Sequence, residues 1–414
     1  MAYLAGRQLM CLIGVAMTFG IYEEALTHTQ IVRGSSSATG VIGTTMNGVM
    51  YLSMPVLATM LNSEPWIGRR RVVALAGTCI TAAGFFASSY STQVWHLILL
   101  QGVIAAFGAA LLYSPTTLVL AERYRSGNRA TAYAVQLSSK NAVGTVSPFI
   151  VYALLDKIGF RGTLRIWAGI VLTTGTLGVW LIPKPMGVQA RRPRKVPWDF
   201  LKHRTFWIYA TANMVFSSGY GLPQTYLGTY ASDELHVAGM WPVIVIAMFN
   251  VPGIISCIGF GLLNDKSSLS AASNTLISAL GSALCVFIFW GFKSHQIVAL
   301  LVTFSVGYGF FAGGFSSTWG GWIQELEREA AFHNEAVDPE ILYGLMNGAR
   351  GIGYVVGGLA GVQLLKAGAL QQSQAFAYGT KYGALILFTG ISAAFGGWAV
   401  IWKASRCGIS RRRV

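Results

Sequence analysis

The sequence carries little charge for its length. Only 11% of its 414 residues are Asp, Glu, Lys or Arg, and 53% are hydrophobic. Soluble domains carry about 25% charged residues. A soluble chain could not cover so apolar a core with so few charges, whereas a lipid bilayer requires no charged cover. The composition therefore argues against a soluble globular protein and predicts an integral membrane protein.

Acidic residues are especially scarce. Fifteen Asp and Glu stand against 30 Lys and Arg, which gives a net charge of +15. Such an excess could indicate nucleic-acid binding, but the basic residues lie mainly in short loops between apolar runs, which is the positive-inside pattern of membrane proteins. We therefore expect a lipid bilayer and no nucleic acid as the partner of this chain.

Signatures of enzymes and metal proteins are also missing. The five cysteines show neither paired nor metal-type spacing. No nucleotide-binding motif is present, and His, Asp and Cys do not cluster at a predicted membrane face. We expect no cofactor, no metal site and no enzymatic activity.

Apolar segments fill the rest of the chain. Twelve of them approach the length of about 20 residues that a bilayer requires. The segments are 4–26, 38–61, 71–90, 94–120, 130–155, 163–182, 206–228, 239–263, 271–292, 296–320, 341–365 and 380–402. They predict an all-α integral membrane fold with two pseudo-symmetric six-helix bundles, residues 1–183 and 205–414. A basic cytoplasmic linker, residues 184–204, joins the two bundles.

The distribution of basic residues predicts the orientation. If the N-terminus is inside, 21 of the 30 Lys and Arg lie in inner segments. Both termini are therefore expected in the cytoplasm, and we expect the plasma membrane, with an organelle membrane as the alternative. One inner segment, Gln324 to Glu340, carries six acids. It could be an acidic cap that pairs with neighbouring basic loops, or a solvated polar turn.

The loop after the second segment reads MLNSEPWIGRRRV. It resembles the signature G-x-x-x-D-[RK]-x-G-[RK]-[RK] of the major facilitator superfamily, which has twelve helices and a basic central loop. Gly68, Arg69 and Arg70 match the end of the signature, and Glu64 lies one residue from the missing Asp. The start of the signature recurs after the eighth segment as Gly261, Asp265 and Lys266. The resemblance implies a secondary transporter with these loop residues at its gate.

Further motifs resemble the monocarboxylate porter family, particularly its fungal members. They are Arg129-Ala130, Gly144, Pro148, Gly159-Phe160-Arg161, Pro223, Tyr226, Tyr230-Ala231, Asn250, Gly261 and Asp265. The resemblance implies transport of a small organic anion with proton symport. Two of the family's cations are missing. Cys257 stands where the animal members have an arginine implicated in carboxylate binding, and their helix 1 lysine has no match in TFGIYEEALTHTQ.

Two other cations lie deep in apolar segments, Lys140 in the fifth and Arg350 in the eleventh. Each is about 15 Å from the cytoplasmic end at 1.5 Å per residue, and the two segments are equivalent under the repeat that relates the halves. A charge at that depth costs about 3 kcal/mol or more, so it should face a cavity or a partner. We predict that Lys140 and Arg350, each with a nearby amide, Asn141 and Asn347, bind the substrate anion. The alternative is a structural role in an ion pair or in bonds to backbone carbonyls.

The remaining candidates have weaker support. Glu23 and Glu24, near the outer end of the first segment, are candidate proton acceptors or merely interfacial residues. Other polar and aromatic side chains could line the cavity: Tyr22, Tyr113, Tyr220, Gln224, Asn250 and Tyr308. For each of these, helix–helix hydrogen bonding or core packing is the alternative. We expect a monomeric, proton-coupled transporter of a small mono- or dicarboxylate; the alternative is an exporter of amphipathic metabolites or drugs.

Overall fold

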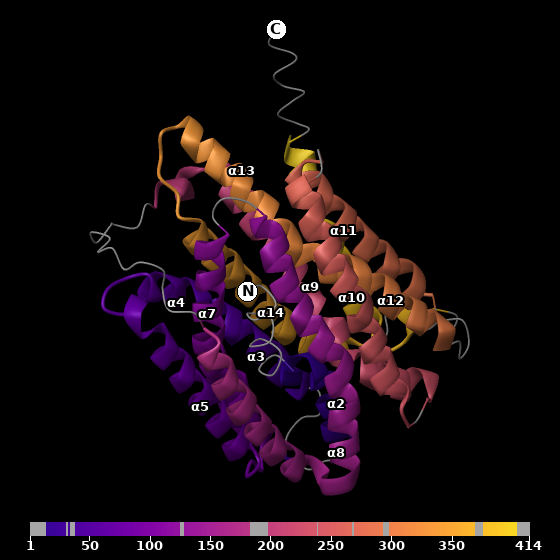
Figure 1. Ribbon diagram of the computed structural model, residues 1–414. Helices are drawn as coiled ribbons and strands as arrows, with labels where there is room; N and C mark the ends of the chain where they lie inside the picture. Colours follow the sequence, from indigo (N-terminus) through magenta and orange to yellow (C-terminus); the bar gives the residue numbers. More distant parts are fainter. Residues whose placement is uncertain are drawn as a thin grey trace.

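Figure 1 shows the computed structural model as a bundle of long helices. It describes residues 14–29, 32–33, 38–124, 128–182, 198–237, 239–266, 269–292, 298–368 and 376–403. Within these ranges the extended structure is limited to one isolated bridge between Arg33 and Gln93. The all-α prediction is therefore confirmed.

The helices follow the predicted segments closely. The first half contains α2 (Gly14–Thr29), α3 (Gly40–Leu52), α4 (Met54–Leu61), α5 (Arg70–Ser88), α6 (Val94–Leu97), η3 (Ile98–Ala105), α7 (Ala106–Arg123) and α8 (Arg129–Trp180). The second contains α9 (Arg204–Leu235), α10 (Trp241–Lys266), α11 (Ala271–Cys285), η5 (Val286–Trp290), α12 (Val298–Gly314), η6 (Phe315–Thr318), α13 (Trp319–Phe332), α14 (Pro339–Ala367) and α15 (Gly383–Phe395). Residues 183–197, most of the predicted linker, lie outside the described ranges, and η4 (Asp199–Lys202) precedes α9.

Helix α8 contains two of the predicted segments. Its backbone breaks at Gly159, where φ is +71° and ψ is 177°. That conformation is open almost only to glycine, because a Cβ would clash with the backbone. The glycine thus separates the fifth span from the sixth without an intervening loop.

Eight helical stretches of the described residues are long and apolar enough to cross a bilayer. They are Gly40–Leu61, Ile67–Ser88, Val94–Arg123, Arg129–Trp180, Trp241–Lys266, Ala271–Trp290, Val298–Phe332 and Gly383–Lys403. Helices α9 and α14 have 32 and 29 residues but are not among them. Both carry buried polar residues, among them Asn213, Gln224, Asn347 and Arg350, and they pack against each other. Polar side chains within membrane spans normally face the bundle interior, where a substrate site would lie.

The most extensive contacts between the two halves are made by three helix pairs. Helix α10 packs on α8, α14 packs on α3, and α2 packs on α9. In Figure 1 the early helices α3, α5 and α7 lie on one side and α10, α11 and α12 on the other. A site between these pairs would be built from both halves.

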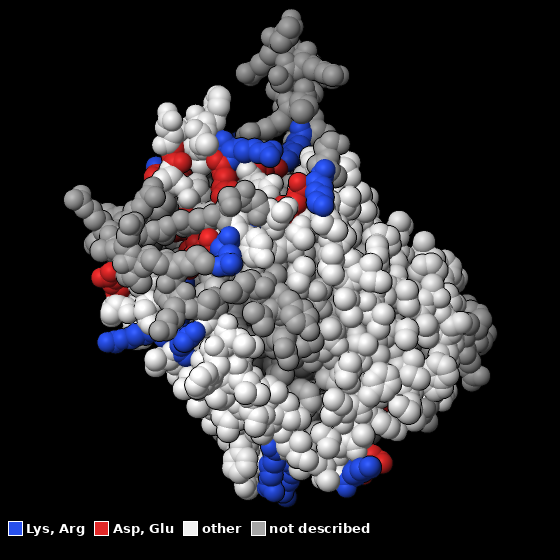
Figure 2. Space-filling model, in the orientation of Figure 1, with Lys and Arg blue, Asp and Glu red and all other residues white. Residues whose placement is uncertain are grey.

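Charged side chains concentrate toward the ends of the bundle. Figure 2 shows Lys, Arg, Asp and Glu toward both ends, with a mostly uncharged band between them. Large apolar side chains such as Val72, Leu177 and Ile255 are exposed on the sides, as lipid-facing residues are. We call one end the α13 end, where α13 meets the starts of α8, α9 and α14. The other, where α2 meets the end of α9, is the opposite end.

Candidate functional site

Arg350 lies at the centre of the molecule, eleven residues after the start of α14. Its side chain is buried, and its guanidinium lies over four aromatic rings. The distances from Cζ to the ring centroids are 4.9 Å for Tyr51, 5.3 Å for Tyr220, 5.5 Å for Tyr354 and 5.6 Å for Trp319. Such cation–π contacts strengthen when they are desolvated. The aromatic rings thus partly replace the water that this charge loses.

Few hydrogen bonds hold the Arg350 guanidinium. Its Nη1 donates to the hydroxyl of Ser316, and its Nη2 donates to the Tyr354 hydroxyl at 3.4 Å. Nε has no hydrogen-bond partner among the described residues. The edge of the guanidinium that carries Nε is therefore available to an acceptor.

Lys140 approaches the same cluster from α8, eleven residues after Arg129. Its side chain is buried, and Nζ lies 5.6 Å from the centroid of the Tyr220 ring. Nζ has no hydrogen-bond partner within the described ranges. The ring of Tyr220 is consequently shared by the two cations, which sequence spacing placed only at a similar depth.

Each cation lies on a ring from the other half of the chain. Lys140 of α8 contacts Tyr220 of α9, and Arg350 of α14 contacts Tyr51 of α3. A movement of one half against the other would change both contacts. The cluster is therefore placed where it can respond to such a movement.

No carboxylate neutralises this pair of charges. All fifteen Asp and Glu residues lie in the described ranges. None of the ion pairs recorded for these ranges includes Lys140 or Arg350. The structural ion pair weighed from the sequence thus finds no support, and the recorded hydrogen bonds of Arg350 go to hydroxyls rather than backbone carbonyls.

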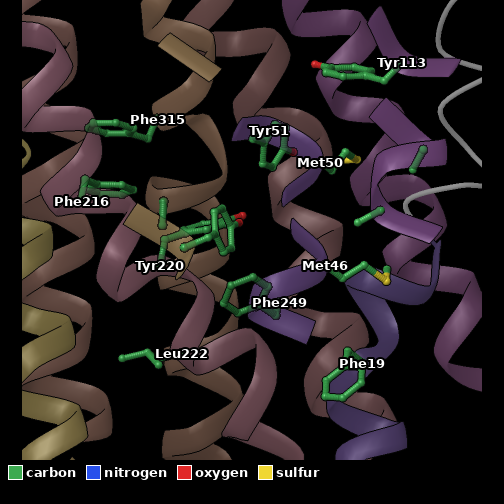
Figure 3. Close-up of a cluster of buried hydrophobic side chains, with 14 of the residues drawn as sticks. Phe19, Met46, Met50, Tyr51, Tyr113, Phe216, Tyr220, Leu222, Phe249 and Phe315 are labelled. Carbon is green, nitrogen blue, oxygen red and sulfur yellow. The ribbon is translucent and has the colours of Figure 1, made fainter. Parts of the chain in front are cut away.

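Aromatic residues extend the cluster on both sides. The Tyr113 ring lies 6.3 Å from that of Tyr51, and the Tyr308 ring lies 6.4 Å from that of Tyr220. The Tyr308 hydroxyl is buried without a hydrogen-bond partner among the described residues, whereas the Tyr113 hydroxyl lies beside that of Tyr343. Figure 3 shows Tyr51, Tyr220 and Phe249, with Met46, around one central region. The structure thus brings Tyr113, Tyr220 and Tyr308 of the predicted set to the two cations.

The amides predicted beside the cations make bonds of a different kind. Asn141 donates through Nδ2 to Sγ of Cys257 at 3.5 Å, and Cys257 donates to the carbonyl of Gly313 at 3.2 Å. These contacts join α8, α10 and α12. Cys257, which stands at the family's arginine position, is therefore buried in helix packing beside the cluster.

Asn250 and Asn347 also bind backbone carbonyls. Nδ2 of Asn250 donates to Gly144 at 3.1 Å, across the α10–α8 contact, and Nδ2 of Asn347 donates to Tyr343 of its own helix at 2.9 Å. Helix packing, the alternative given for Asn250, accounts for its bond. The acceptor oxygen of Asn250 remains without a partner among the described residues.

Tyr22 and Gln224 have recorded contacts with other helices. Tyr22 packs edge-on against Phe160 of α8 at 6.0 Å. Gln224 is buried on α9, and its backbone oxygen lies close to Gly20 of α2. Both belong to the contact between α2 and its neighbours rather than to the cation cluster.

Glu23 lies buried near the opposite end, among hydroxyl groups. Its carboxylate accepts hydrogen bonds from Thr27 at 3.1 Å, from Thr39 at 3.3 Å and from Thr229 of α9. The adjacent Glu24 accepts from Ser232, also of α9, at 2.5 Å. The two acids therefore tie the halves together at this end.

The signature loop forms part of a closure at the α13 end. Arg70 is buried and donates to Glu122 at 2.9 Å and to Asn62 at 2.8 Å. Asn62 in turn donates to Glu340 of α14 at 2.7 Å. Arg70 thus acts through Asn62 on the other half, whereas Gly68, Arg69 and Glu64 lie on or near the surface.

Asp265 supplies a second link at this end. Its carboxylate accepts from the backbone N–H and the hydroxyl of Thr131, in the first turn of α8, at 2.8 and 2.7 Å. Arg129 in the same turn forms an ion pair with Glu327 of α13. A negative charge at a helix N-terminus is favourable, so Asp265 holds α8 against α10, while Lys266 is exposed.

The acidic segment at this end is paired rather than solvated. Glu325 accepts from Lys403 at 2.6 Å, and Glu327 pairs with Arg129. His203 lies between Glu335 at 2.7 Å and Glu329 at 3.3 Å. Partial burial lowers the pKa of His203, but its hydrogen bond to Glu335 and the charge of Glu329 outweigh that effect and raise the pKa. The structure thus supports the acidic-cap interpretation.

Sequence reasoning missed four members of the cluster: Tyr51, Ser316, Trp319 and Tyr354. Tyr354 follows Arg350 by one helical turn, and that spacing places it on the same face. Tyr51, Ser316 and Trp319 come from other helices, and nothing local in the sequence distinguishes them. Their role depends on how the helices pack.

Comparison with known proteins agrees with this architecture. The family model described as Major Facilitator Superfamily matches residues 8–361. The nucleoside transporter NupG superposes with a TM-score of 0.68 over 97% of both chains, at 13% sequence identity, which is evidence for the fold alone.

Curated relatives are distant but cover much of the chain. MFS transporter asaE of Aspergillus flavus is 24% identical over 74% of this chain and 68% of its own. Monocarboxylate transporter 11 of Mus musculus is 27% identical over 47% of this chain, which spans only 44% of that protein. The aspyridones efflux protein apdF of Emericella nidulans is 24% identical over 93% of this chain and 77% of its own. The chain belongs to the major facilitator superfamily and is a membrane transporter, not an enzyme.

Proposed function

We propose that this transporter moves a small organic anion, a mono- or dicarboxylate, by alternating access of residues 1–183 against 205–414. The supporting observation is the pair of buried cations, Lys140 and Arg350, which share the Tyr220 ring and have no carboxylate partner among the described residues. Like charges on one ring repel each other, and a bound anion would relieve that repulsion. The substrate would then supply the charge that the protein lacks.

Arg350 is the principal anchor in this proposal. A guanidinium stays charged and can bind a carboxylate through two parallel N–H groups. Its faces are covered by rings, and its Nε edge is free. Lys140 would add a second contact, which a dicarboxylate uses more fully than a monocarboxylate.

Proton coupling is assigned to Glu23. A carboxylate buried among three hydroxyl groups can exchange a proton without losing all of its hydrogen bonds, because each hydroxyl both donates and accepts. Two of those hydroxyls, from Thr39 and Thr229, lie on other helices. Protonation would weaken their bonds and so help to open this end.

Export of an amphipathic metabolite is the second candidate function. The relative that covers 93% of the chain is named an efflux protein, and the cluster around Arg350 is mainly aromatic. The two candidates differ in direction and in the apolar part of the substrate, and both can use the same cations.

Counterflow in proteoliposomes tests the main proposal. Vesicles containing the purified chain and an unlabelled acid should accumulate the same radiolabelled acid, and vesicles with a neutral analogue should not. Uptake of the neutral analogue alone would contradict an anion carrier. The same assay with a panel of neutral amphipathic compounds tests the second candidate function, export of an amphipathic metabolite.

The membrane orientation follows from the basic loops. We propose that both termini and the linker lie in the cytoplasm of a plasma-membrane protein that acts as a monomer. Single cysteines placed at residues 233–237 should react with an impermeant maleimide on intact cells, whereas those at residues 188–198 should not. Labelling of the second set would reverse the orientation.

A further inference from the structure

The cluster around Arg350 also carries information about the body of the substrate. Small hydrophilic acids need charge and hydrogen bonds, and a site made for them would be lined by polar groups. Here the cation is surrounded by Tyr51, Tyr220, Tyr354 and Trp319. When an anion binds Arg350, the rest of the molecule would therefore lie against aromatic rings.

The rings are arranged as a loose box rather than a close stack. Tyr51 and Tyr354 are stacked with centroids 5.9 Å apart, and Tyr220 meets Tyr354 edge-on at 6.2 Å. Tyr220 and Tyr308 are stacked at 6.4 Å. Aromatic pairs attract at 4.5–7 Å, and these ring pairs lie toward the long end of that range.

Unsatisfied polar atoms in the box indicate the rest of the substrate. Nζ of Lys140, Nε of Arg350, Nε1 of Trp319 and the hydroxyl of Tyr308 are buried and have no partner among the described residues. Buried polar groups are normally hydrogen-bonded. Three of these four atoms are N–H donors that cannot accept, and the hydroxyl can donate. The complementary ligand is therefore rich in acceptor oxygens.

We propose that the substrate is an aromatic carboxylate that carries further oxygen atoms, such as a hydroxyl or keto group. Its carboxylate binds the Nε edge of Arg350, its ring lies against Tyr51 and Tyr220, and its second oxygen faces Lys140. This inference rests on the proposed function and narrows its substrate class. It also joins the two candidate functions, because such acids are both anionic and amphipathic.

Thermal stabilisation of the purified full-length chain tests the inference with three matched ligands. They are 4-hydroxyphenylacetate, acetate, which has the same charge without the ring, and 4-hydroxyphenylacetamide, which has the ring without the charge. The aromatic acid should raise the apparent melting temperature at a concentration at least about tenfold lower than the other two. Phenylpyruvate adds an aromatic acid with a keto oxygen to the comparison, and succinate adds an aliphatic acid with two charges.

A substitution then locates the binding site. Tyr51→Leu should bring the response to the aromatic acid down to that of acetate, whereas Tyr51→Phe should retain it. Tyr90→Leu is the matched control, because Tyr90 lies under Arg165 at 4.9 Å, outside the cluster. An unchanged response in Tyr51→Leu would overturn the assignment of the ring contact.

The outcomes separate this inference from the proposed function. If acetate and the aromatic acid stabilise equally, the aromatic class is overturned and anion transport stands. If the amide stabilises as well as the acid, the charge is not recognised and the proposed function falls. If no aromatic acid in the panel binds, the inference is overturned, and counterflow of aliphatic acids decides the proposed function by itself.

Discussion

Cations at the α13 end and cations at the centre of this protein have opposite partners. At the α13 end Arg70, Arg129 and Lys403 each meet a carboxylate. At the centre Lys140 and Arg350 meet rings and a hydroxyl. Removing one member of a buried ion pair destabilises the fold, because it leaves the other charge unpaired. An unpaired buried cation already costs free energy, so such a residue usually has a function. The comparison distinguishes the paired cations of the α13 end from those of the proposed binding site.

The largest expected effect is at Arg350. Arg350→Ala should weaken anion binding about a hundredfold, or about 2.7 kcal/mol, which is the scale of hydrogen bonds to a charged group. Arg350→Lys keeps the charge but loses the planar fork, so binding should also fall severely. Substrate-induced thermal stabilisation, with folding checked by size-exclusion chromatography, measures both.

Lys140 and a distant arginine complete this experiment. Lys140→Ala should impair binding of a dicarboxylate more than that of a monocarboxylate, because only the former uses two cations. Arg165→Ala removes a guanidinium that likewise lies over a tyrosine ring and donates to a serine hydroxyl, that of Ser89, but at the surface. The affinity of the Arg165→Ala variant for the anion should be unchanged. Wild-type affinity in well-folded Arg350→Ala and Lys140→Ala would show the central cations to be structural.

The next effect concerns the acid at the opposite end. Glu23→Gln keeps the shape and removes the ionisable group, so proton-driven accumulation should fall to the level of equilibrium exchange, while exchange itself persists. Uptake with and without an imposed pH gradient measures the difference. Glu24→Gln is the matched control, since Glu24 is only half-buried. If accumulation survives in Glu23→Gln but fails in Glu24→Gln, the neighbouring acid carries the proton.

Sequence alone predicted the helices well, and it predicted only some of the residues that gather around Arg350. The length of apolar runs follows from bilayer thickness, so the described helices lie where hydropathy placed them. The depth of Lys140 and Arg350 follows from helical rise. Their convergence on Tyr220, and the contributions of Tyr51 and Trp319, depend on which helix faces pack together. Residues separated by hundreds of positions leave no local pattern that would predict that packing.

The acidic segment illustrates the same limit. Its six acids were visible in the sequence, but their partners were not, because Arg129, His203 and Lys403 come from three distant parts of the chain. A count of charges could only leave open a paired cap or a solvated turn. Tertiary packing decided between them.

A smaller effect is expected from the closure at the α13 end. Arg129→Glu should repel Glu327 and favour opening there, and the charge swap Arg129→Glu with Glu327→Arg should restore closure. Because the Glu327 side chain is 31% exposed, we expect about 1 kcal/mol, or about a fivefold change in population. The rate at which a hydrophilic maleimide labels Asn347→Cys, in a chain without native cysteines, measures it.

An exposed pair at the same end provides the control. Lys202 and Asp199 bond within one turn of η4, both in the linker, and their side chains are 77% and 52% exposed. Lys202→Glu should leave the labelling rate unchanged. Equal acceleration by Lys202→Glu and Arg129→Glu would mean that net charge, and not the cross-half ion pair, governs opening.

The smallest effect is a dependence of stability on pH that belongs to the α13 end alone. The pKa of His203 is raised above its ordinary value, because its bond to Glu335 and the charge of Glu329 outweigh partial burial. The protonated ring therefore stabilises the fold fully below the ordinary histidine pKa, and this contribution is lost as the pH rises through the raised pKa.

His203→Gln should lower the apparent melting temperature by about 1 °C at pH 5.5 and leave it unchanged at pH 9. Two other histidines serve as controls for the loss of an imidazole: His333, whose ring lies 5.4 Å from that of His203, and His96, which meets the Trp95 ring edge-on. Because His203 lies in the linker directly before α9, and Glu329 and Glu335 lie in the second half, none of these variants should alter anion affinity at the centre. A shift in affinity that followed the His203 titration would show that the two regions are coupled rather than separate.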